Sequence, residues 1–361
     1  MSAHYFGKDW AVADTRTPVR ILVVDDSAVM RAWIDGIFRD YPGIEIAAKV
    51  ATAAQAFDYL AGHPVDIILL DHEMPGQKGV EALPHMLALA RGAHVVLLSS
   101  FGERGSELSV KALSLGASDV IRKPTRHQAT PAFAVSLIER FTRLTAARQQ
   151  SPGPEEQGGL RTFPDDFRLG CIGIGASTGG IHSLGTVLAG LRRRPGVPVL
   201  VTQHLPDAFI PYYARQVAGM TDLPVTVARQ DMVLEPDHIY IAPGDRSLTC
   251  RPVAGRACID LNPARDPATR TRPSVNAMFA GMAACFGAGA FGVVLTGIGR
   301  DGTAGAKQIV AAGGAIITQD RASSTVWGMP GSAARAGLSC AVLPPAAMMD
   351  YLFHRAGGEE T

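Results

Sequence analysis

The sequence predicts an α/β protein with two doubly wound domains, each built on a mostly parallel sheet. Short, nearly continuous apolar runs alternate with helix-like segments along both halves of the chain, which is typical of parallel strands covered on both faces. A stretch rich in Pro, Gly and charge at 149–159 separates the halves. The length of 361 residues also exceeds that of one ordinary domain.

The composition supports buried cores and excludes some classes of partner. Hydrophobic residues make up 47% of the chain and charged residues 19%. The net charge of +1 gives no overall field for nucleic acid, so none is expected as a partner. The five cysteines show neither CxxC pairing nor metal-ligand spacing, and we expect reduced thiols in a cytoplasmic protein.

An uncharged stretch, 277–299, is long enough to suggest a membrane span. Its repeated glycines instead favour a buried helix over 277–285, a glycine turn and a strand over 291–296. The N-terminus lacks the apolar core of a secretion signal. We therefore expect no membrane insertion.

Five apolar runs in the first half predict the strands of one sheet. They are RILVVDD (20–26), IEIAAKVA (44–51), VDIILLD (65–71), AHVVLLSS (93–100) and ASDVIRK (117–123). Helical stretches lie between the runs, and an amphipathic helix over 133–144 closes this domain.

Polar residues stand at the ends of these runs, where an open parallel sheet collects its functional groups. Asp25 and Asp26 end the first run, Asp71 the third, Ser99 the fourth and Lys123 the fifth. Three carboxylates at one edge would repel one another unless a divalent cation lay among them, and oxygen ligands suit Mg²⁺. Asp71 would then accept a phosphoryl group, with Ser99 and Lys123 contacting its oxygens. A lone acid there would more often only start a turn, but the ordered set favours the phosphoryl site.

A second α/β series begins near residue 168, with the strand-like runs LGCIGIGA, VPVLVTQH, HIYIAP, FGVVLTGIG and GGAIITQD. The first run continues into the turn GIGASTGG and then a helix. Two weak motifs overlap at this turn. One is a glycine turn of the dinucleotide-binding type, and the other is a G-x-S-x-G nucleophile elbow around Ser177.

The next strand separates these two possibilities. A nicotinamide-binding fold needs an acid near its end, but this strand ends in Gln203 and His204. His204 is placed to act as general base to Ser177. The later strand leads into GIGRDG, which puts Asp301 on a tight turn where a buried carboxylate would orient the imidazole. We therefore predict a triad of Ser177, His204 and Asp301, with oxyanion donors after Ser177 and in the loop 297–299.

Motifs in both halves resemble known families. VVDDSAVMR, LLDHEMPG, LLSS and IRKP resemble response-regulator receivers, whose fold is flavodoxin-like. IGASTGG, VLVTQHLP, YIAPGD, RPSVNAMF and LTGIGRDGTAGA resemble the catalytic domain of the chemotaxis protein-glutamate methylesterases (CheB), which is Rossmann-like. The division expected from this resemblance is an extension over 1–17, a receiver over 18–145, a linker over 146–166 and a catalytic domain over 167–355.

The resemblance implies a phosphorylation-regulated hydrolase of chemotaxis. It would hydrolyse γ-glutamyl methyl esters on the cytoplasmic helices of chemoreceptors, releasing methanol, and deamidate certain receptor glutamines to glutamate. Ser177 would be the nucleophile, His204 the base and Asp301 the orienting carboxylate, with no cofactor for the hydrolysis. Ile298 stands where the family often has Met and Asn276 where it often has Asp, and neither change removes a triad member.

For the first half, the resemblance implies phosphorylation of Asp71 by a chemotaxis histidine kinase, with Mg²⁺ held by Asp25, Asp26 and Asp71. A flexible linker between a receiver and a hydrolase suggests that the unphosphorylated receiver covers the Ser177 site.

Two other classes of function stay open. The second domain would be a nicotinamide-dependent oxidoreductase if the glycine turn bound a dinucleotide, or a non-catalytic output module if it signalled only by contact. Three further histidines compete for the base role, although none ends a core strand: His182, His238 and His354.

Overall fold

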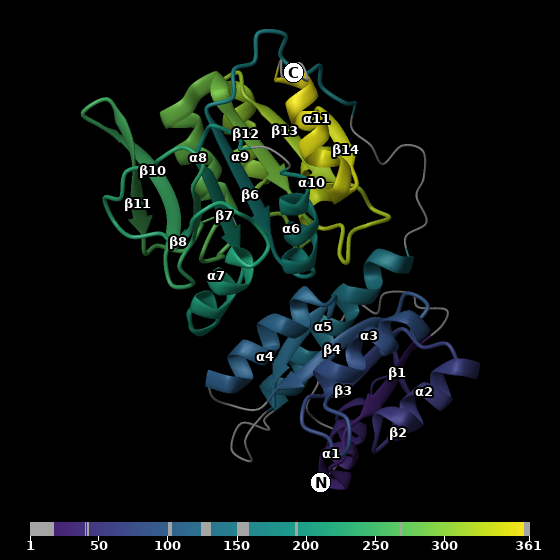
Figure 1. The fold of residues 1–361 in the computed structure, drawn as a ribbon. Coiled ribbons are helices and arrows are strands. Elements are labelled where there is room, and N and C mark those ends of the chain that lie inside the picture. The colour runs from purple at the N-terminus through teal and green to yellow at the C-terminus, as the bar shows by residue number, and fades with distance from the viewer. Residues whose placement is uncertain are drawn as a thin grey trace. The chain divides into compact units, whose positions relative to one another are not determined.

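The computed structural model describes residues 18–39, 41, 43–99, 103–123, 131–149, 159–191, 194–267 and 269–356. The chain divides into two compact units, residues 1–150 and 151–361 (Figure 1). The expected N-terminal extension and residues 150–158 of the expected linker lie outside the described residues.

The N-terminal unit contains a five-stranded sheet in the order β2-β1-β3-β4-β5, with every neighbouring pair parallel. Its strands are β1 (Val19–Val24), β2 (Ile44–Val50), β3 (Ile67–Asp71), β4 (His94–Ser99) and β5 (Asp119–Arg122). Its helices are α1 (Ala28–Phe38), α2 (Ala53–Gly62), α3 (Gly79–Leu89), α4 (Glu103–Ser114) and α5 (Pro131–Gln149). The central strand β3 is buried along its whole length, as expected where helices cover both faces of a sheet.

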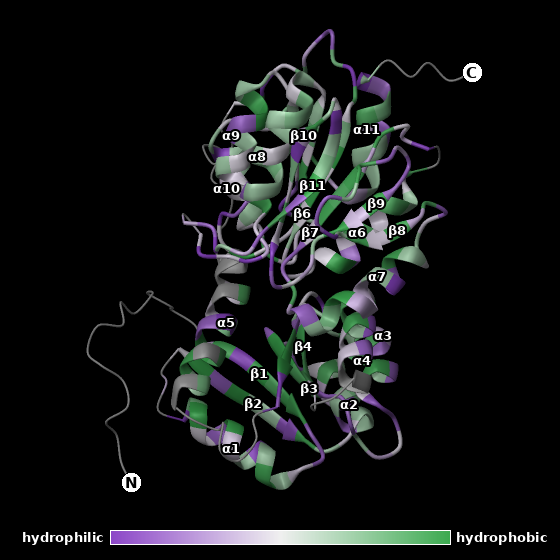
Figure 2. Cartoon of the chain, turned by 90° about the vertical axis from the view of Figure 1, so that its left-hand side faces the viewer, coloured by the Kyte–Doolittle hydropathy of each residue, from purple (hydrophilic) through white to green (hydrophobic). Residues whose placement is uncertain are grey.

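The C-terminal unit contains a seven-stranded parallel sheet in the order β14-β13-β12-β6-β7-β9-β8. Its strands are β6 (Cys171–Ala176), β7 (Val199–Gln203), β8 (Val225–Val227), β9 (Ile239–Ile241), β12 (Ala290–Val294), β13 (Ala315–Gln319) and β14 (Ala341–Leu343). Its helices are α6 (Gly180–Ala189), α7 (Ile210–Ala218), α8 (Val275–Phe286), α9 (Thr303–Ala311), α10 (Met329–Arg335) and α11 (Met348–Arg355). Short 3₁₀ turns cover Asp207–Phe209, Gly287–Gly289 and Pro345–Ala347. In Figure 2 hydrophobic colour marks the strands of this sheet, and hydrophilic colour gathers on the connecting loops.

Both sheets have a switch point, where the chain order reverses about a central strand. In the N-terminal unit, β1 lies between β2 and β3. In the C-terminal unit, β6 lies between β7 and β12. Loops at the carboxyl ends of such strands diverge and leave room for functional groups, so these two places are where sites are expected.

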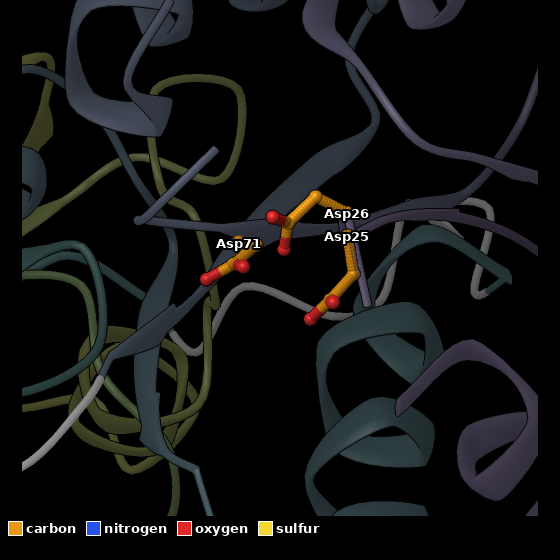
Figure 3. Close-up of side chains that lie close together, drawn as sticks. All are labelled: Asp25, Asp26 and Asp71. Carbon is orange, nitrogen blue, oxygen red and sulfur yellow. The ribbon is translucent and has the colours of Figure 1, made fainter. Parts of the chain in front are cut away.

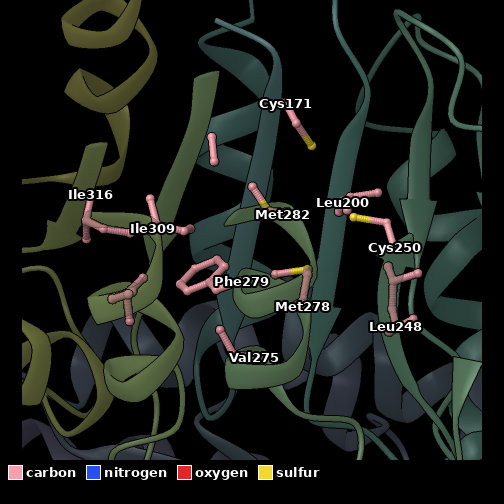
Figure 4. Close-up of a cluster of buried hydrophobic side chains, with 14 of the residues drawn as sticks. Cys171, Leu200, Leu248, Cys250, Val275, Met278, Phe279, Met282, Ile309 and Ile316 are labelled. Atoms are coloured by element: carbon pink, nitrogen blue, oxygen red, sulfur yellow. The ribbon is translucent and has the colours of Figure 1, made fainter. Parts of the chain in front are cut away.

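Helix α8 packs directly on the central strand β6, and glycines make this close approach possible. A Cβ atom at Gly173 would lie 2.7 Å from Met282 Cε, and one at Gly175 would lie 2.8 Å from Val275 Cγ2. Met282 and Val275 belong to a buried cluster that α8 shares with the sheet (Figure 4). The alternating glycines of β6 therefore serve helix packing.

An antiparallel ribbon formed by β10 (Ser247–Val253) and β11 (Arg256–Asn262) was not among the predicted strands. Its two-residue turn has positive φ at both Ala254 and Gly255, which is the geometry that a tight hairpin requires. The short edge strands β8 and β14 were also not predicted. The helix and strand expected within 277–299 are confirmed as α8 and β12. Among the described residues, no helix has the length and apolar character needed to cross a bilayer.

Gly281 brings α8 against β10, since a Cβ atom there would lie 2.6 Å from the backbone nitrogen of Cys250. We expect Gly281→Ala to lower the free energy of unfolding of the C-terminal unit by about 1–3 kcal/mol through overpacking. Gly36, exposed in α1, is the matched control because a Cβ atom there meets nothing within 4 Å. Gly36→Ala should stabilise its unit by about 0.5–1 kcal/mol in urea unfolding. A stabilised Gly281→Ala protein would contradict the packing argument.

Candidate functional site

Ser177, His204 and Asp301 all lie at the switch point of the C-terminal unit. Ser177 directly follows β6, and His204 directly follows β7, the neighbouring strand. Asp301 lies in the loop after β12, the neighbour on the other side. The carboxyl ends of three adjacent strands thus present the three predicted residues.

Hydrogen bonds to the backbone of Ser177 hold it between the segments on either side. Its N–H donates to the carbonyl of Thr296 (3.0 Å), and its carbonyl accepts from Gln203 Nε2 (2.7 Å). The N–H of His204 donates to the carbonyl of Ala176 (3.0 Å). The turn that carries Ser177 is therefore fixed relative to the strand that carries His204.

The His204 imidazole contacts the Asp301 carboxylate, with Nε2 2.8 Å from Oδ2. With a proton on Nε2 donated to Asp301, the other ring nitrogen, Nδ1, is left as a proton acceptor. No hydrogen bond joins the Ser177 hydroxyl to His204 among the described residues. The structure thus pairs His204 with Asp301 and places Ser177 at the end of the neighbouring strand. In sites of this kind the hydrogen bond between nucleophile and base often forms only when substrate is bound.

Asp301 is 1% exposed and lies at the N-terminus of α8. Its carboxylate accepts from the N–H groups of Val275 (2.8 Å) and Asn276 (3.0 Å), which begin that helix. The hydroxyls of Thr271 (3.0 Å) and Ser274 (3.2 Å) also donate to it. A helix N-terminus favours negative charge because its N–H groups and its dipole point toward the anion.

These contacts decide the charge state of Asp301. Burial alone would raise the pKa of its carboxyl, but hydrogen bonds from His204 and from the N–H groups of Val275 and Asn276 outweigh burial, and the pKa is lowered. Asp301 is therefore an anion that can stabilise a positive charge developing on His204.

Two backbone N–H groups beside Ser177 donate to no other group among the described residues, those of Thr178 and Ile298. The loop that carries Ile298 lies against the serine, because a Cβ atom at Gly297 would be 2.7 Å from Ser177 Cβ. Free N–H groups on both sides of a nucleophile are what an oxyanion needs. They occur in the two segments where donors were predicted.

Several supporting residues were missed by sequence reasoning. Thr271 and Ser274 bind Asp301 from a loop distant in sequence. Asn276 Oδ1 accepts from the N–H groups of Gly302 and Gly305, both at 2.9 Å, and so holds the turn that follows Asp301. The serine that precedes the α8 pattern, in RPSVNAMF, is a helix-capping signal that could have indicated this helix start.

The competing interpretations of the site find no support. Gly179 is explained by packing alone, because a Cβ atom there would lie 2.5 Å from Thr325 Cβ. His238 precedes β9 and so lies at the amino end of the sheet, where it contacts Thr226 Oγ1 (2.8 Å). His182 and His354 are exposed on helices.

The second predicted site lies at the switch point of the N-terminal unit. Single carboxylate oxygens of Asp25, Asp26 and Asp71 lie within 4.8 Å of one another (Figure 3). Lys123 Nζ is 2.7 Å from Asp71 Oδ2 and 3.1 Å from Asp25 Oδ2. Ser99, at the end of β4, accepts a hydrogen bond from Ser109 Oγ (3.1 Å). The structure therefore gathers the three acids and the lysine, with Ser99 on the adjacent strand end.

The electrostatics of this cluster suit a divalent cation. Burial and the nearby Asp25 raise the pKa of Asp71, against the opposing effect of Lys123. Beyond Lys123, the buried Oδ2 atoms of Asp25 and Asp71 accept no hydrogen bond from the described residues. Oxygen donors with free lone pairs, one of them on the exposed Asp26, fit Mg²⁺ with room for water and a phosphoryl group.

Comparison with known proteins identifies the family of each unit. The CheB methylesterase family matches residues 172–352, and the response regulator receiver domain matches residues 21–132. The chain belongs to the CheB methylesterase family. Its N-terminal unit is a receiver domain, and its C-terminal unit is a CheB methylesterase domain.

Relatives of this CheB chain match it along most of its length. A protein-glutamate methylesterase/protein-glutamine glutaminase from Nitrobacter hamburgensis is 38% identical over 91% of both chains. A second one, from Caulobacter vibrioides, is 37% identical over 94% of this chain and 99% of the relative. The catalytic domain of Thermotoga maritima CheB is 31% identical with a TM-score of 0.50, covering 52% of this chain and 98% of that one.

We expect Asp301→Asn to destabilise the C-terminal unit by about 2–4 kcal/mol at neutral pH, because a neutral amide cannot satisfy the donors around it. The folded pKa of Asp301 is lowered. The stabilisation of the folded state by ionised Asp301 is therefore complete above the ordinary pKa of about 4. It is lost as the pH falls through the lower pKa of the folded state. The difference between the two proteins in urea unfolding should shrink below about pH 4. Asp260→Asn, on the exposed ribbon, is the control, and equal effects of the two changes would contradict this role.

Proposed function

We propose that this CheB protein hydrolyses γ-glutamyl methyl esters on the cytoplasmic helices of chemoreceptors, with Ser177 as nucleophile. Its Oγ attacks the ester carbonyl while His204 Nδ1 takes the hydroxyl proton, and the carbonyl π electrons move onto oxygen. The N–H groups of Thr178 and Ile298 stabilise this oxyanion, a contribution worth about 3–4 kcal/mol for one donor in comparable sites. The oxyanion then collapses, and His204 returns the proton to the leaving methoxide, which departs as methanol.

Water completes the reaction by attacking the glutamyl–Ser177 ester. His204 takes a proton from water and returns it to Ser177 Oγ as the acyl–oxygen bond breaks, so the serine is regenerated and the receptor glutamate is released. With a glutamine side chain the leaving group is ammonia, so deamidation follows the same steps. Besides water, the proposed steps use only groups of the chain itself. A substrate on cytoplasmic receptor helices would place the enzyme in the cytoplasm.

One observation carries this proposal: the His204–Asp301 pair at 2.8 Å beside the strand end that holds Ser177. A lowered pKa keeps Asp301 charged, so it supports the imidazolium formed in both steps. The name shared by the relatives, protein-glutamate methylesterase/protein-glutamine glutaminase, supports the class of substrate.

Control is assigned to the receiver unit, where Asp71 would accept a phosphoryl group from a chemotaxis histidine kinase. Mg²⁺ bound by Asp25, Asp26 and Asp71 would neutralise charge on the incoming phosphate. Lys123 already contacts Asp71 and would pair with a phosphoryl oxygen, and Ser99 would donate to another.

Ser177→Ala should abolish methanol release from a methylated receptor fragment, a loss of at least about 10³-fold in kcat. Phosphorylation of Asp71 by a small phosphodonor, followed on phosphate-affinity gels, should be unchanged because the serine lies in the other unit. Retention of full methanol release would remove Ser177 from the mechanism.

Asp71→Asn should leave the full-length enzyme unresponsive to acetyl phosphate and Mg²⁺, because an amide cannot accept the phosphoryl group. Methanol release with and without the phosphodonor is the measurement. A stimulation that persists in this variant would place the regulatory acceptor elsewhere. His63→Gln, on the exposed end of α2, is the control and should respond as the native chain does.

A further inference from the structure

Two loops meet at Asp301, and each is held there by its own contacts. The loop 263–273 reaches the carboxylate through Thr271 Oγ1 (3.0 Å), and Asp301 itself belongs to the loop 297–302. Asp266, in the first loop, accepts from Ser274 Oγ (3.0 Å), a hydroxyl that also donates to Asp301. The two loops are therefore positioned by the same network that orients His204.

Four arginines stand on these loops, and all are exposed: Arg265, Arg270, Arg272 and Arg300. We call them the arginine rim. Arg270 and Arg272 flank Thr271, and Arg300 immediately precedes Asp301. Three of the four rim arginines thus lie within one residue of Thr271 or Asp301, and Arg265 stands in the same loop as Thr271.

The positive charges of the rim are not neutralised within the described residues, where none of the four arginines forms an ion pair. Arg265 and Arg272 donate only to backbone carbonyls, at 3.2 and 2.9 Å. Exposed arginines on the ribbon differ, because Arg251 pairs with Asp231 and Arg256 with Glu235, both at 2.6 Å.

The acids of the same loops face the other way. Within 263–273 and 297–302 the acids are Asp266 and Asp301, and both are hydrogen-bonded inward to the α8 N-terminal segment. Four cations face solvent while two anions face the protein. Such an arrangement gives a local positive field beside the nucleophile although the whole chain carries only +1.

We propose that the arginine rim binds carboxylates that flank the reacting side chain, so the enzyme prefers a γ-glutamyl ester on an acidic segment. This inference rests on the proposed function and adds the feature of the substrate that the rim recognises, its acidic neighbours. The reacting ester is neutral and needs no cation for its own chemistry. Guanidinium groups pair with carboxylates through two parallel N–H bonds, which makes acidic neighbours the fitting partner.

The test uses the full-length enzyme with acetyl phosphate and Mg²⁺, and a receptor cytoplasmic fragment with one γ-methyl glutamate. In one version of the fragment the neighbouring glutamates are kept, and in the other they are replaced by alanine, which preserves helix propensity. Glutamine is avoided because the enzyme would deamidate it. The variant is Arg270→Gln with Arg300→Gln, since neither guanidinium holds the loop, and Arg256→Gln on the ribbon is the control.

We expect the double variant to raise KM for the acidic fragment about threefold to tenfold, with kcat unchanged and no change for the alanine fragment. Salt at about 300 mM should remove the difference between the fragments for the native enzyme, because exposed charges are screened. An unchanged KM, or a loss equal for both fragments, would overturn the rim proposal. If the native enzyme released no methanol from either fragment, the proposed function itself would fail, and this inference with it.

Discussion

Burial of the Asp301 carboxylate at the N-terminus of α8 is the interaction on which the catalytic unit depends. A buried charge is costly unless it is hydrogen-bonded and compensated. Here the first N–H groups of α8 and two hydroxyls compensate it, and His204 contacts it as well. Because the anion that starts the helix also orients the base, folding of this segment and positioning of the imidazole are one event.

Both sites follow from a simple rule of parallel sheets, and so most of their residues could be predicted from strand ends. Apolar runs marked the buried strands, with Asp71 at the end of one strand in the first unit and Ser177 and His204 directly after two strands in the second. The ribbon β10–β11 and the three-residue edge strands escaped prediction, because half-exposed or very short strands lack a clear period. Thr271 was missed because its role depends on a contact with Asp301, thirty residues away.

The glycine turn shows where local sequence cannot decide. Gly173 and Gly175 fit a dinucleotide motif as well as a strand under a helix, because both require an absent side chain. The position of α8, with Val275 and Met282 filling the space beside these glycines, explains them as part of a strand under a helix. The absence of an acid after β7 was the more useful signal in the sequence. A nicotinamide site needs that acid to bind the ribose, whereas glycines are used in many kinds of site.

Around the Ser177 site the acidic side chain of Asp301 and the arginine side chains point in opposite directions, which affects turnover. The carboxylate of Asp301 faces inward, where its negative charge supports His204. The arginine rim faces outward, where it can bind an anion on the substrate. Hydrolysis converts a neutral ester into a carboxylate, so each reaction adds a negative charge to the segment that the rim binds. On this account a demethylated position strengthens attraction for an ester nearby on the same helix. The same attraction slows release of the product, and salt that weakens one effect must weaken the other.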